Sequence, residues 1–225
     1  MCQILDVPYV PYQCLILEGT KSTTLVSACP TMIKRNQEFI SAYEVLQERK
    51  EQITNSPKDY ELYLSILKEH HVPYAEEYVQ KMFMVDFILA NEDRHLGNFG
   101  IIRDLDTMEW ISVCPVFDTG RSLNTNIAKK YWLDEVVDMK FFSYQFVQSD
   151  IVSQIFSIPV SYKQIQDMYD VVNLFEEILL RFQTELRLNL NDIDVLKQSF
   201  KKRIKLFEKI MTNKGLINER EKPKI

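Results

Sequence analysis

The polar run NEDRHLGN at residues 91–98 constrains the fold of this chain more than any other stretch. It follows an apolar segment of helical character (FMVDFILA) and precedes a strand-like segment, FGIIR at 99–103. A second strand pattern, EWISVC at 109–114, leads into another polar loop, FDTG at 117–120. A hairpin formed by these two strands would return the chain and bring the two polar loops together.

The remaining periodicity predicts a small β-hairpin followed by helices. YQCLILE (12–18) and TTLVSAC (23–29) are typical of two strands joined by a turn. Apolar residues at helical spacing predict helices over 37–50, after Ser56-Pro57 and from Pro73 to Leu89. Two further helices are expected in the C-terminal hundred residues, with a stripe of apolar residues from Ile165 to Leu186, a turn at 189–194 and a last helix through Phe207. The fold class is therefore α+β and mainly helical.

Composition excludes several classes of function. The 225-residue chain has a formal net charge of −5 at pH 7, so it lacks the basic footprint of a nucleic-acid-binding domain. Its cysteines are scattered, which argues against a zinc site and a disulfide framework and favours a cytoplasmic protein: Cys2, Cys14, Cys29 and Cys114. No signal peptide is visible, and no apolar run is long enough to span a bilayer, so no membrane contact is expected.

The two polar loops carry the residue types that phosphoryl transfer requires. A kinase needs a carboxylate to orient or deprotonate the attacking hydroxyl and oxygen ligands for Mg²⁺. Asp93 precedes Asn98 by five residues, as in kinase catalytic loops, and Asp118 follows across the expected hairpin. Each motif alone is common in surface turns. Their order and spacing together favour a kinase over a pair of turns.

These motifs resemble the active-site segment of HipA-like Ser/Thr protein kinases. Asn91, Asp93, His95 and Asn98 match that family's N-x-D-x-H-x-x-N loop, and Phe117-Asp118 matches its metal-binding motif. The resemblance extends over roughly residues 5 to 125. It implies a mainly helical, protein-kinase-like C-lobe preceded by a β-hairpin remnant of the N-lobe, with ATP and Mg²⁺ as cofactors and a protein hydroxyl as substrate.

The resemblance also implies a role for each matching residue. Asp93 would act as the catalytic base, while Asn98 and Asp118 would bind Mg²⁺. His95 would lie beside the nucleotide, and Phe117 would pack against the nucleotide or within the core. The backbone from Cys29 to Thr31 would form the hinge that meets adenine. Arg94 is interpreted only as a solvated charge. Members of the family often act as toxins held in check by an antitoxin partner.

Several features of a complete kinase are missing from this sequence. No G-x-G-x-x-G motif exists, and no strand Lys precedes a helix with a partner Glu. The expected organisation is the end of an N-lobe and hinge at 1–30, a C-lobe at 31–212 and a polar tail at 213–225. The chain could be a fragment, one half of a split kinase whose N-lobe is a separate polypeptide, or a degenerate protein. We expect little or no phosphotransfer by this chain alone.

Two alternatives remain open at this stage. One is an inactive, pseudokinase-like interaction module. The other is an enzyme of the phosphatidylinositol-kinase type, since those lipid kinases share the D-R-H-x-x-N spelling of residues 93–98. The protein substrate cannot be derived from the sequence, because substrate choice depends on surfaces without a transferable code.

Overall fold

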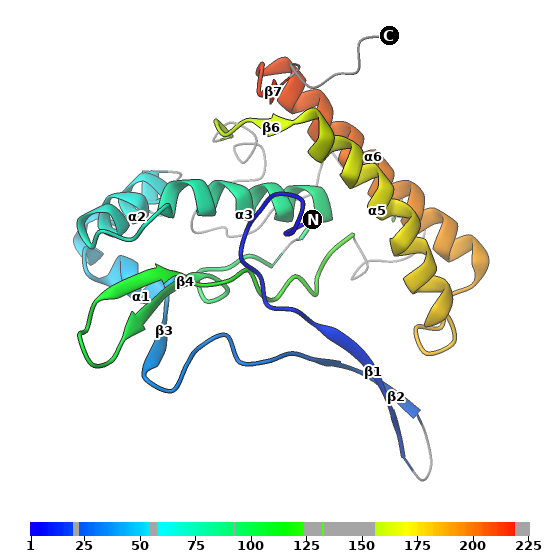
Figure 1. Cartoon of the computed structure of the whole chain (residues 1–225), viewed down its shortest axis with the longest axis horizontal. Coiled ribbons are helices and arrows are strands. Elements are labelled where there is room, and N and C mark those ends of the chain that lie inside the picture. Colours follow the sequence, from blue (N-terminus) through cyan, green and yellow to red (C-terminus); the bar gives the residue numbers. More distant parts are fainter. Residues whose placement is uncertain (20–22, 55–57, 92, 124–131, 133–155, 219–225) are drawn as a thin grey trace.

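The computed structural model describes residues 1–19, 23–54, 58–91, 93–123, 132 and 156–218. It is a mixed α/β structure with small sheets and a mainly helical C-terminal region (Figure 1). The α+β class predicted from the sequence is therefore confirmed. Within the described ranges, none of the helices combines the length and the apolar character that a bilayer crossing requires.

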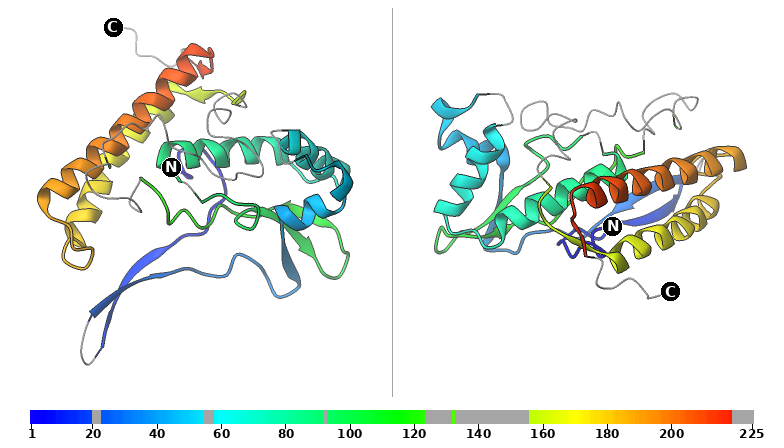
Figure 2. Two further views of the ribbon diagram at one scale, coloured as in Figure 1. Left: turned by 180° about the vertical axis from the view of Figure 1, so that it is seen from behind. Right: turned by 90° about the horizontal axis from the view of Figure 1, so that it is seen from above.

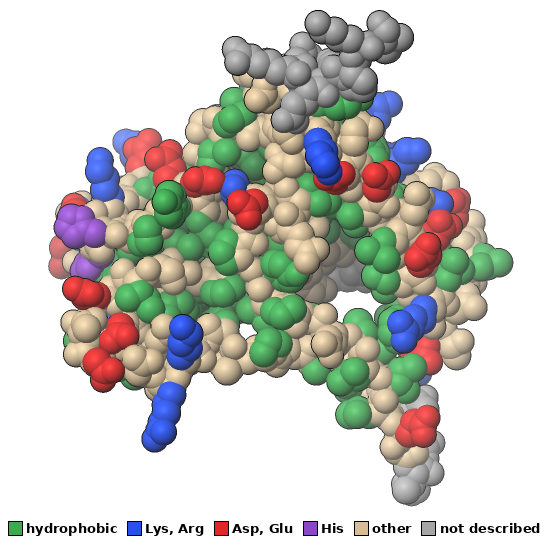
Figure 3. All heavy atoms as spheres, in the orientation of Figure 1, with side chains coloured by type: hydrophobic (Ala, Val, Ile, Leu, Met, Phe, Trp, Pro, Cys, Tyr) green, Lys and Arg blue, Asp and Glu red, His purple; other side chains and the backbone are tan. Residues whose placement is uncertain are grey.

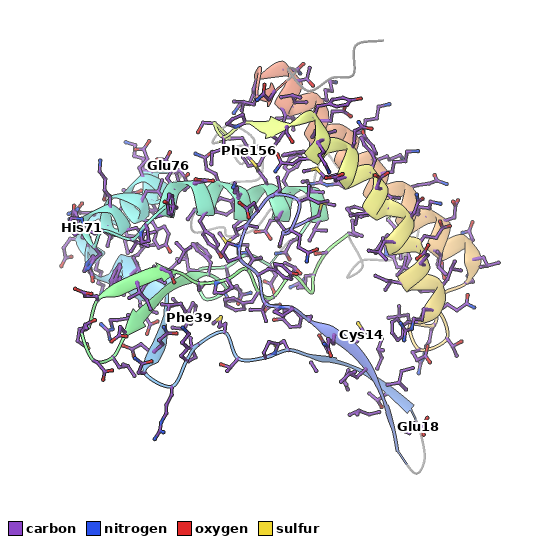
Figure 4. The ribbon with its side chains drawn as sticks, in the orientation of Figure 1. Cys14, Glu18, Phe39, His71, Glu76 and Phe156 are labelled. Atoms are coloured by element: carbon purple, nitrogen blue, oxygen red, sulfur yellow. The ribbon has the colours of Figure 1, made fainter. Side chains whose placement is uncertain are left out.

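The N-terminal hairpin forms as predicted and projects from the rest of the molecule as an arm (Figures 1 and 2). Strands β1 (Gln13–Glu18) and β2 (Thr23–Ala28) pair antiparallel, with Gln13 opposite Ala28 and Glu18 opposite Thr23. Every residue of β1 is exposed, and Cys14 and Glu18 mark this strand in Figure 4. The turn expected between the strands lies mostly outside the described residues.

A three-stranded antiparallel sheet carries the candidate site. Its strands β3 (Gln37–Ser41), β4 (Gly100–Asp104) and β5 (Trp110–Val113) lie in that order. The β4–β5 hairpin predicted between the two polar loops is confirmed, with a register irregularity next to Ile102. The pairing returns the chain from the first polar loop to the second, as the sequence pattern required.

The helix predicted over 37–50 is wrong for its first five residues. These residues form β3, where Phe39 lies opposite Ile102 and Glu38 pairs with Arg103 at 2.5 Å. Cross-strand contacts of this kind stabilise an extended segment that helical periodicity alone misassigns. Helix α1 (Ala42–Gln47) begins only after Ser41, whose side chain forms a capping box with Glu44.

The central helix α3 (Ala75–Leu89) is buried along most of its length, as predicted. It lies beside α2 (Lys58–Glu69), which follows the short 3₁₀ helix η1 (Lys50–Gln52). Buried Tyr63 of α2 packs edge-to-face against Phe99, with ring centroids 5.6 Å apart. The helix pair therefore supports the segment that enters the sheet from the candidate site.

The C-terminal region is a long helix pair, α5 (Tyr162–Arg181) and α6 (Leu190–Asn213). The two helices lie side by side in Figures 1 and 2. Both predicted helices are confirmed, although α5 ends before the stripe expected to reach Leu186. The expected turn at 189–194 is mostly helix, because Asn189 caps α6. Two residues of the expected polar tail form a strand, β7 (Ile217–Asn218), which pairs parallel with β6 (Val160–Ser161).

An aromatic cluster fastens α6 to α3. The rings of Phe87, Phe156 and Phe207 lie pairwise 5.9–6.2 Å apart, and Figure 4 shows Phe156 above α3. Arg203 is fully buried beside this cluster, with its guanidinium carbon 4.6 Å from the Phe87 ring centre. Its Nε also donates to the Phe87 carbonyl at 3.0 Å, so the helix pair is held to the element that leads into the site.

Candidate active site

Helix α3 delivers the first polar loop in a fixed direction. Ala90, at its C-terminal end, adopts a left-handed conformation with φ of 55°. Asn91 then turns back on the helix: its backbone N–H donates to the Asp86 carbonyl at 2.9 Å. Its side-chain amide donates to the Asp86 carboxylate, also at 2.9 Å. The start of the loop is thus fastened to the last turn of a buried helix.

A side-chain hydrogen bond closes the loop between the two residues of the D-x4-N motif. The Asn98 side-chain amide donates to the Asp93 carbonyl at 2.9 Å, and the Asn98 backbone N–H donates to the His95 carbonyl at 2.8 Å. Because the amide nitrogen is used within the loop, the side-chain oxygen of Asn98 is the atom left to act as a ligand. Asn98 is buried, so its orientation is well determined by its surroundings.

Arg94 joins the two polar loops and is not the solvated charge expected from the sequence. Its side chain is fully buried and pairs with Asp86 through two bonds, Nε to Oδ2 at 2.8 Å and Nη2 to Oδ1 at 3.0 Å. Its Nη1 donates to the Asn98 carbonyl at 2.7 Å and to the Phe117 carbonyl at 2.6 Å. Because both carbonyl oxygens accept hydrogen bonds from the same nitrogen, Arg94 holds the two loops close together.

The charge of Arg94 is maintained by its partner. Burial alone lowers the pKa of a guanidinium, but the Asp86 carboxylate more than offsets this effect, and the net pKa of Arg94 is raised. One sequence signal could have revealed this pair. Asp86 is the single charged residue of the run FMVDFILA, and a carboxylate on a buried helix needs a cationic partner nearby.

The second polar loop places Asp118 in an unusual backbone conformation. Asp118 has a φ of 51°, in the left-handed region that Asp tolerates better than most residues, and its side chain is exposed. Preceding it, Phe117 packs edge-to-face on Phe39 of β3, with ring centroids 5.6 Å apart. Beyond it, the Leu123 backbone N–H donates to the Leu89 carbonyl at 2.8 Å. Both flanks of Asp118 are therefore anchored.

The N-terminal segment lies beside the strand that enters this second loop. The Val10 N–H donates to the Val116 carbonyl at 2.9 Å, and the Val116 N–H donates to the Pro8 carbonyl at 2.8 Å. Farther along, burial raises the pKa of the Tyr12 hydroxyl, while a hydrogen bond from the Asp118 backbone opposes the shift and the Cys29 thiol adds to it. Tyr12 thus brings the end of the arm to Asp118.

Asp93 is accessible and faces a cation. Its carboxylate Oδ2 lies 3.9 Å from Nη1 of Arg121, with 38% of the Asp93 side chain and 54% of the Arg121 side chain exposed. At this separation and exposure the pair contributes little to stability. Arg121 comes from the second polar loop, so the two loops also meet at the surface. Sequence reasoning missed this residue, which has no motif signal of its own.

The remaining predicted site residues are His95, Cys29 and Thr31. His95 is exposed, and its Nδ1 accepts a hydrogen bond from the Gly97 N–H at 3.0 Å, so the neutral ring carries its proton on Nε2. Cys29 and Asp118 both lie close enough to the Tyr12 hydroxyl to shift its pKa. Thr31 is exposed and bonds locally to Ile33 at 3.4 Å. Within the described part of the chain, no hydrogen bond or ion pair joins Thr31 to the polar loops.

Two pockets in the described part of the chain lie away from the two polar loops. Their volumes are about 920 and 720 Å³, and they lie at the α2–α3 turn and under the N-terminal segment. Figure 3 also shows openings between the arm and the helical body.

Comparison with solved structures shows that the fold is similar to that of a kinase. The crystal structure of a Helicobacter pylori proinflammatory kinase, CtkA, matches with a TM-score of 0.64, covering 96% of this chain and 84% of that chain. Sequence identity in this superposition is 15%, so the likeness concerns the fold alone.

One curated protein is similar to part of this sequence. The curated Ser/Thr-protein kinase CtkA of Helicobacter pylori is 30% identical over 112 residues, which represent 48% of this chain and 34% of the relative. The alignment thus spans about a third of the relative's length. No protein-family model matches the chain. The chain is therefore similar to a Ser/Thr protein kinase in part of its sequence and in its fold, which supports the kinase side of the predicted resemblance.

Proposed function

We propose that this chain is the catalytic C-lobe of a HipA-like Ser/Thr protein kinase that transfers the γ-phosphate of ATP to a protein hydroxyl. One observation carries the proposal: buried Arg94 bonds the carbonyls of Asn98 and Phe117 with a single nitrogen. This contact brings together the two loops whose residues a kinase uses for its base and its metal. The two anchored flanks of Asp118 support the same conclusion.

The donor set of the two loops fits Mg²⁺. Asn98 offers its side-chain oxygen and Asp118 an exposed carboxylate, and Mg²⁺ prefers oxygen ligands from one or two protein groups together with phosphates. Among the described residues, no three His, Cys, Asp or Glu side chains gather as a metal site. A kinase site does not need such a group, because an Asn and the nucleotide supply the other ligands. When bound, Mg²⁺ would neutralise charge on the phosphates.

The other residues complete the proposed mechanism. Asp93 accepts the proton of the substrate hydroxyl as the hydroxyl oxygen bonds to the γ-phosphorus, the bond from that phosphorus to the bridging oxygen breaks, and ADP leaves. His95 and Phe117 lie toward the nucleotide, and the backbone at Cys29–Thr31 contacts adenine. Residues 1–30 would then be the end of an N-lobe with its hinge, and residues 31–212 the C-lobe. The closed Asp93–Asn98 loop keeps the base and the metal ligand at a constant separation.

The direct test is calorimetric titration with ATP in the presence of Mg²⁺. We expect weak binding to the wild-type chain, and an affinity lower by about tenfold or more in Asp118→Ala, because a charged ligand of the metal is lost. Asp170→Ala removes an exposed acid from α5 and serves as the matched control, with unchanged affinity. Binding that survives fully in Asp118→Ala would rule out the proposed metal site.

Thiol labelling tests the proposed hinge. Cys14 and Cys29 are exposed and should react fast with a maleimide, whereas burial raises the pKa of Cys114 to about 12 and of Cys2 to a lesser extent, so both should react slowly. Mg²⁺-ATP should slow the labelling of Cys29 and leave that of Cys14 unchanged, as followed by mass spectrometry. Equal rates at Cys29 with and without nucleotide would contradict the hinge assignment.

A second candidate function is that of a non-catalytic interaction module. It is favoured by the Arg121 guanidinium, which lies beside the proposed base. In either case, phosphotransfer by the isolated 225-residue chain should be slight. A separate N-lobe polypeptide or an antitoxin would be the expected partner, on the HipA-like resemblance alone. Robust phosphorylation of a protein by the purified chain would exclude the module.

A further inference from the structure

A small pocket next to the first polar loop contains an unusual carboxylate. The pocket has a volume of about 330 Å³ and lies between α1, η1, the start of α2 and Leu96. Leu96 belongs to the loop that carries Asp93, and its carbonyl accepts a hydrogen bond from the Tyr43 N–H at 3.1 Å. The pocket therefore adjoins the surface over which a substrate would pass.

Asp59 forms part of the wall of this pocket and has one oxygen in use and one without a partner. Only 1% of Asp59 is exposed. Its Oδ1 accepts from the backbone N–H and the hydroxyl of Thr54, both at 2.8 Å. In the described part of the structure, its Oδ2 has no hydrogen-bond partner. A buried carboxylate oxygen without a hydrogen-bond partner raises the free energy of the folded protein, so a cation that binds to it would stabilise the site.

We propose that this pocket binds an arginine side chain of the protein substrate, with its guanidinium against Asp59. The inference rests on the proposed function and names a substrate class for it. Tyr43, with 54% of its surface exposed, also lines the pocket and offers an aromatic face on which a planar guanidinium can stack. An arginine suits this combination of carboxylate and ring better than a lysine does.

The position of the pocket fixes where the arginine lies in the substrate. Leu96 follows Asp93 by three residues, so their Cα atoms lie within about 11 Å of each other. An extended peptide advances about 3.3 Å per residue. An arginine two or three residues from the phosphoacceptor would therefore reach the pocket while the acceptor hydroxyl lies at Asp93.

Lys50 also lines the pocket and defines a second variant. It is exposed, and no ion pair joins it to Asp59 among the described residues. Its positive charge nonetheless opposes an incoming guanidinium. Replacing Lys50 by Gln should therefore strengthen arginine binding, whereas replacing Asp59 by Asn should weaken it.

Peptide binding without nucleotide tests the inference. The probes are fluorescein-labelled, Ala-rich peptides with one central Ser and a single Arg placed in turn at each neighbouring position. Each is compared by fluorescence anisotropy with the same peptide carrying citrulline, the neutral isostere of Arg. At one position, Arg should bind about tenfold or more tighter than citrulline. Asp59→Asn should abolish this preference, and Lys50→Gln should increase it.

The control variant is Glu61→Gln, which removes an exposed acid from the same turn of α2 and should keep the preference for Arg. Asp59→Asn retains an oxygen for Thr54, so the local fold is preserved. No Arg preference in the wild-type chain, or one that survives in Asp59→Asn, or one lost equally in Glu61→Gln, would overturn the inference.

The outcomes also separate this inference from the proposed function. An Asp59-dependent Arg preference in a chain that binds no Mg²⁺-ATP would support the pocket and refute the kinase site. Mg²⁺-ATP binding that depends on Asp118, together with no Arg preference, would refute the pocket alone.

Discussion

Replacing Arg94 by Met is expected to destabilise the fold by about 3–5 kcal/mol, because it leaves the Asp86 carboxylate buried and unpaired. Arg94 is fully buried, and Asp86 is 2% exposed. The variant also loses the bonds to the Asn98 and Phe117 carbonyls, so the two polar loops would no longer be joined at Nη1. Urea denaturation followed by circular dichroism measures the change in the free energy of unfolding.

Two controls separate the buried pair from a general effect of charge. Arg121→Met removes an exposed guanidinium beside Asp93 and should change stability by no more than about 0.5 kcal/mol. The double variant Asp86→Leu with Arg94→Met removes both buried charges and should recover part of the lost stability. An Arg94→Met variant within about 1 kcal/mol of the wild type would show that the pair does not hold the loops.

The second large effect is expected from Gly100→Ala. Gly100 lies opposite Ser41 where β4 begins, directly after the first polar loop. A Cβ atom at this position would lie 2.0 Å from the Ile40 carbonyl oxygen and 2.9 Å from the Ser41 Cα. Both are backbone atoms, which cannot rotate away as a side chain can, so β3 would have to move away from β4. We expect a destabilisation of about 3 kcal/mol or more, measured by thermal and urea unfolding.

Gly120 provides the matched substitution for this prediction. Among the described residues, a Cβ atom added at Gly120 would meet the Asp118 side chain alone, at an ordinary distance of 3.8 Å. Gly120→Ala should therefore leave the unfolding midpoint nearly unchanged. If both Ala variants unfold at the wild-type midpoint, the close pairing of β3 with β4 at the site would be disproved.

Much of the fold could be predicted from local patterns. The β1–β2 hairpin, the β4–β5 hairpin and the long helices each have a clear periodicity and turn residues. β3 was missed because its residues also fit a helical spacing, and its extended form depends on pairing with β4, some sixty residues away. A Ser41–Glu44 capping box marks where the helix starts, and this signal could have corrected the boundary.

The candidate site could be predicted only in part. The spacing of Asp93, Asn98 and Asp118 indicated which residues to consider, and the comparison with a Ser/Thr kinase supports the same class of enzyme. The role of Arg94 could not be derived from spacing, because its partners come from α3 and from both polar loops. Arg121 was missed for a similar reason, since its approach to Asp93 depends on how the second loop turns after Asp118.

In the proposed site, Asn98 and Asp118 bind one Mg²⁺ together with ATP. A double-mutant cycle of Mg²⁺-ATP affinity, measured by calorimetry on the wild type, Asn98→Ala, Asp118→Ala and the double variant, tests it most directly. If both residues bind the same ion, each single variant should lose affinity, and the double variant should lose hardly more than Asp118→Ala alone. Losses that simply add, or affinities that match the wild type throughout, would contradict a shared metal site.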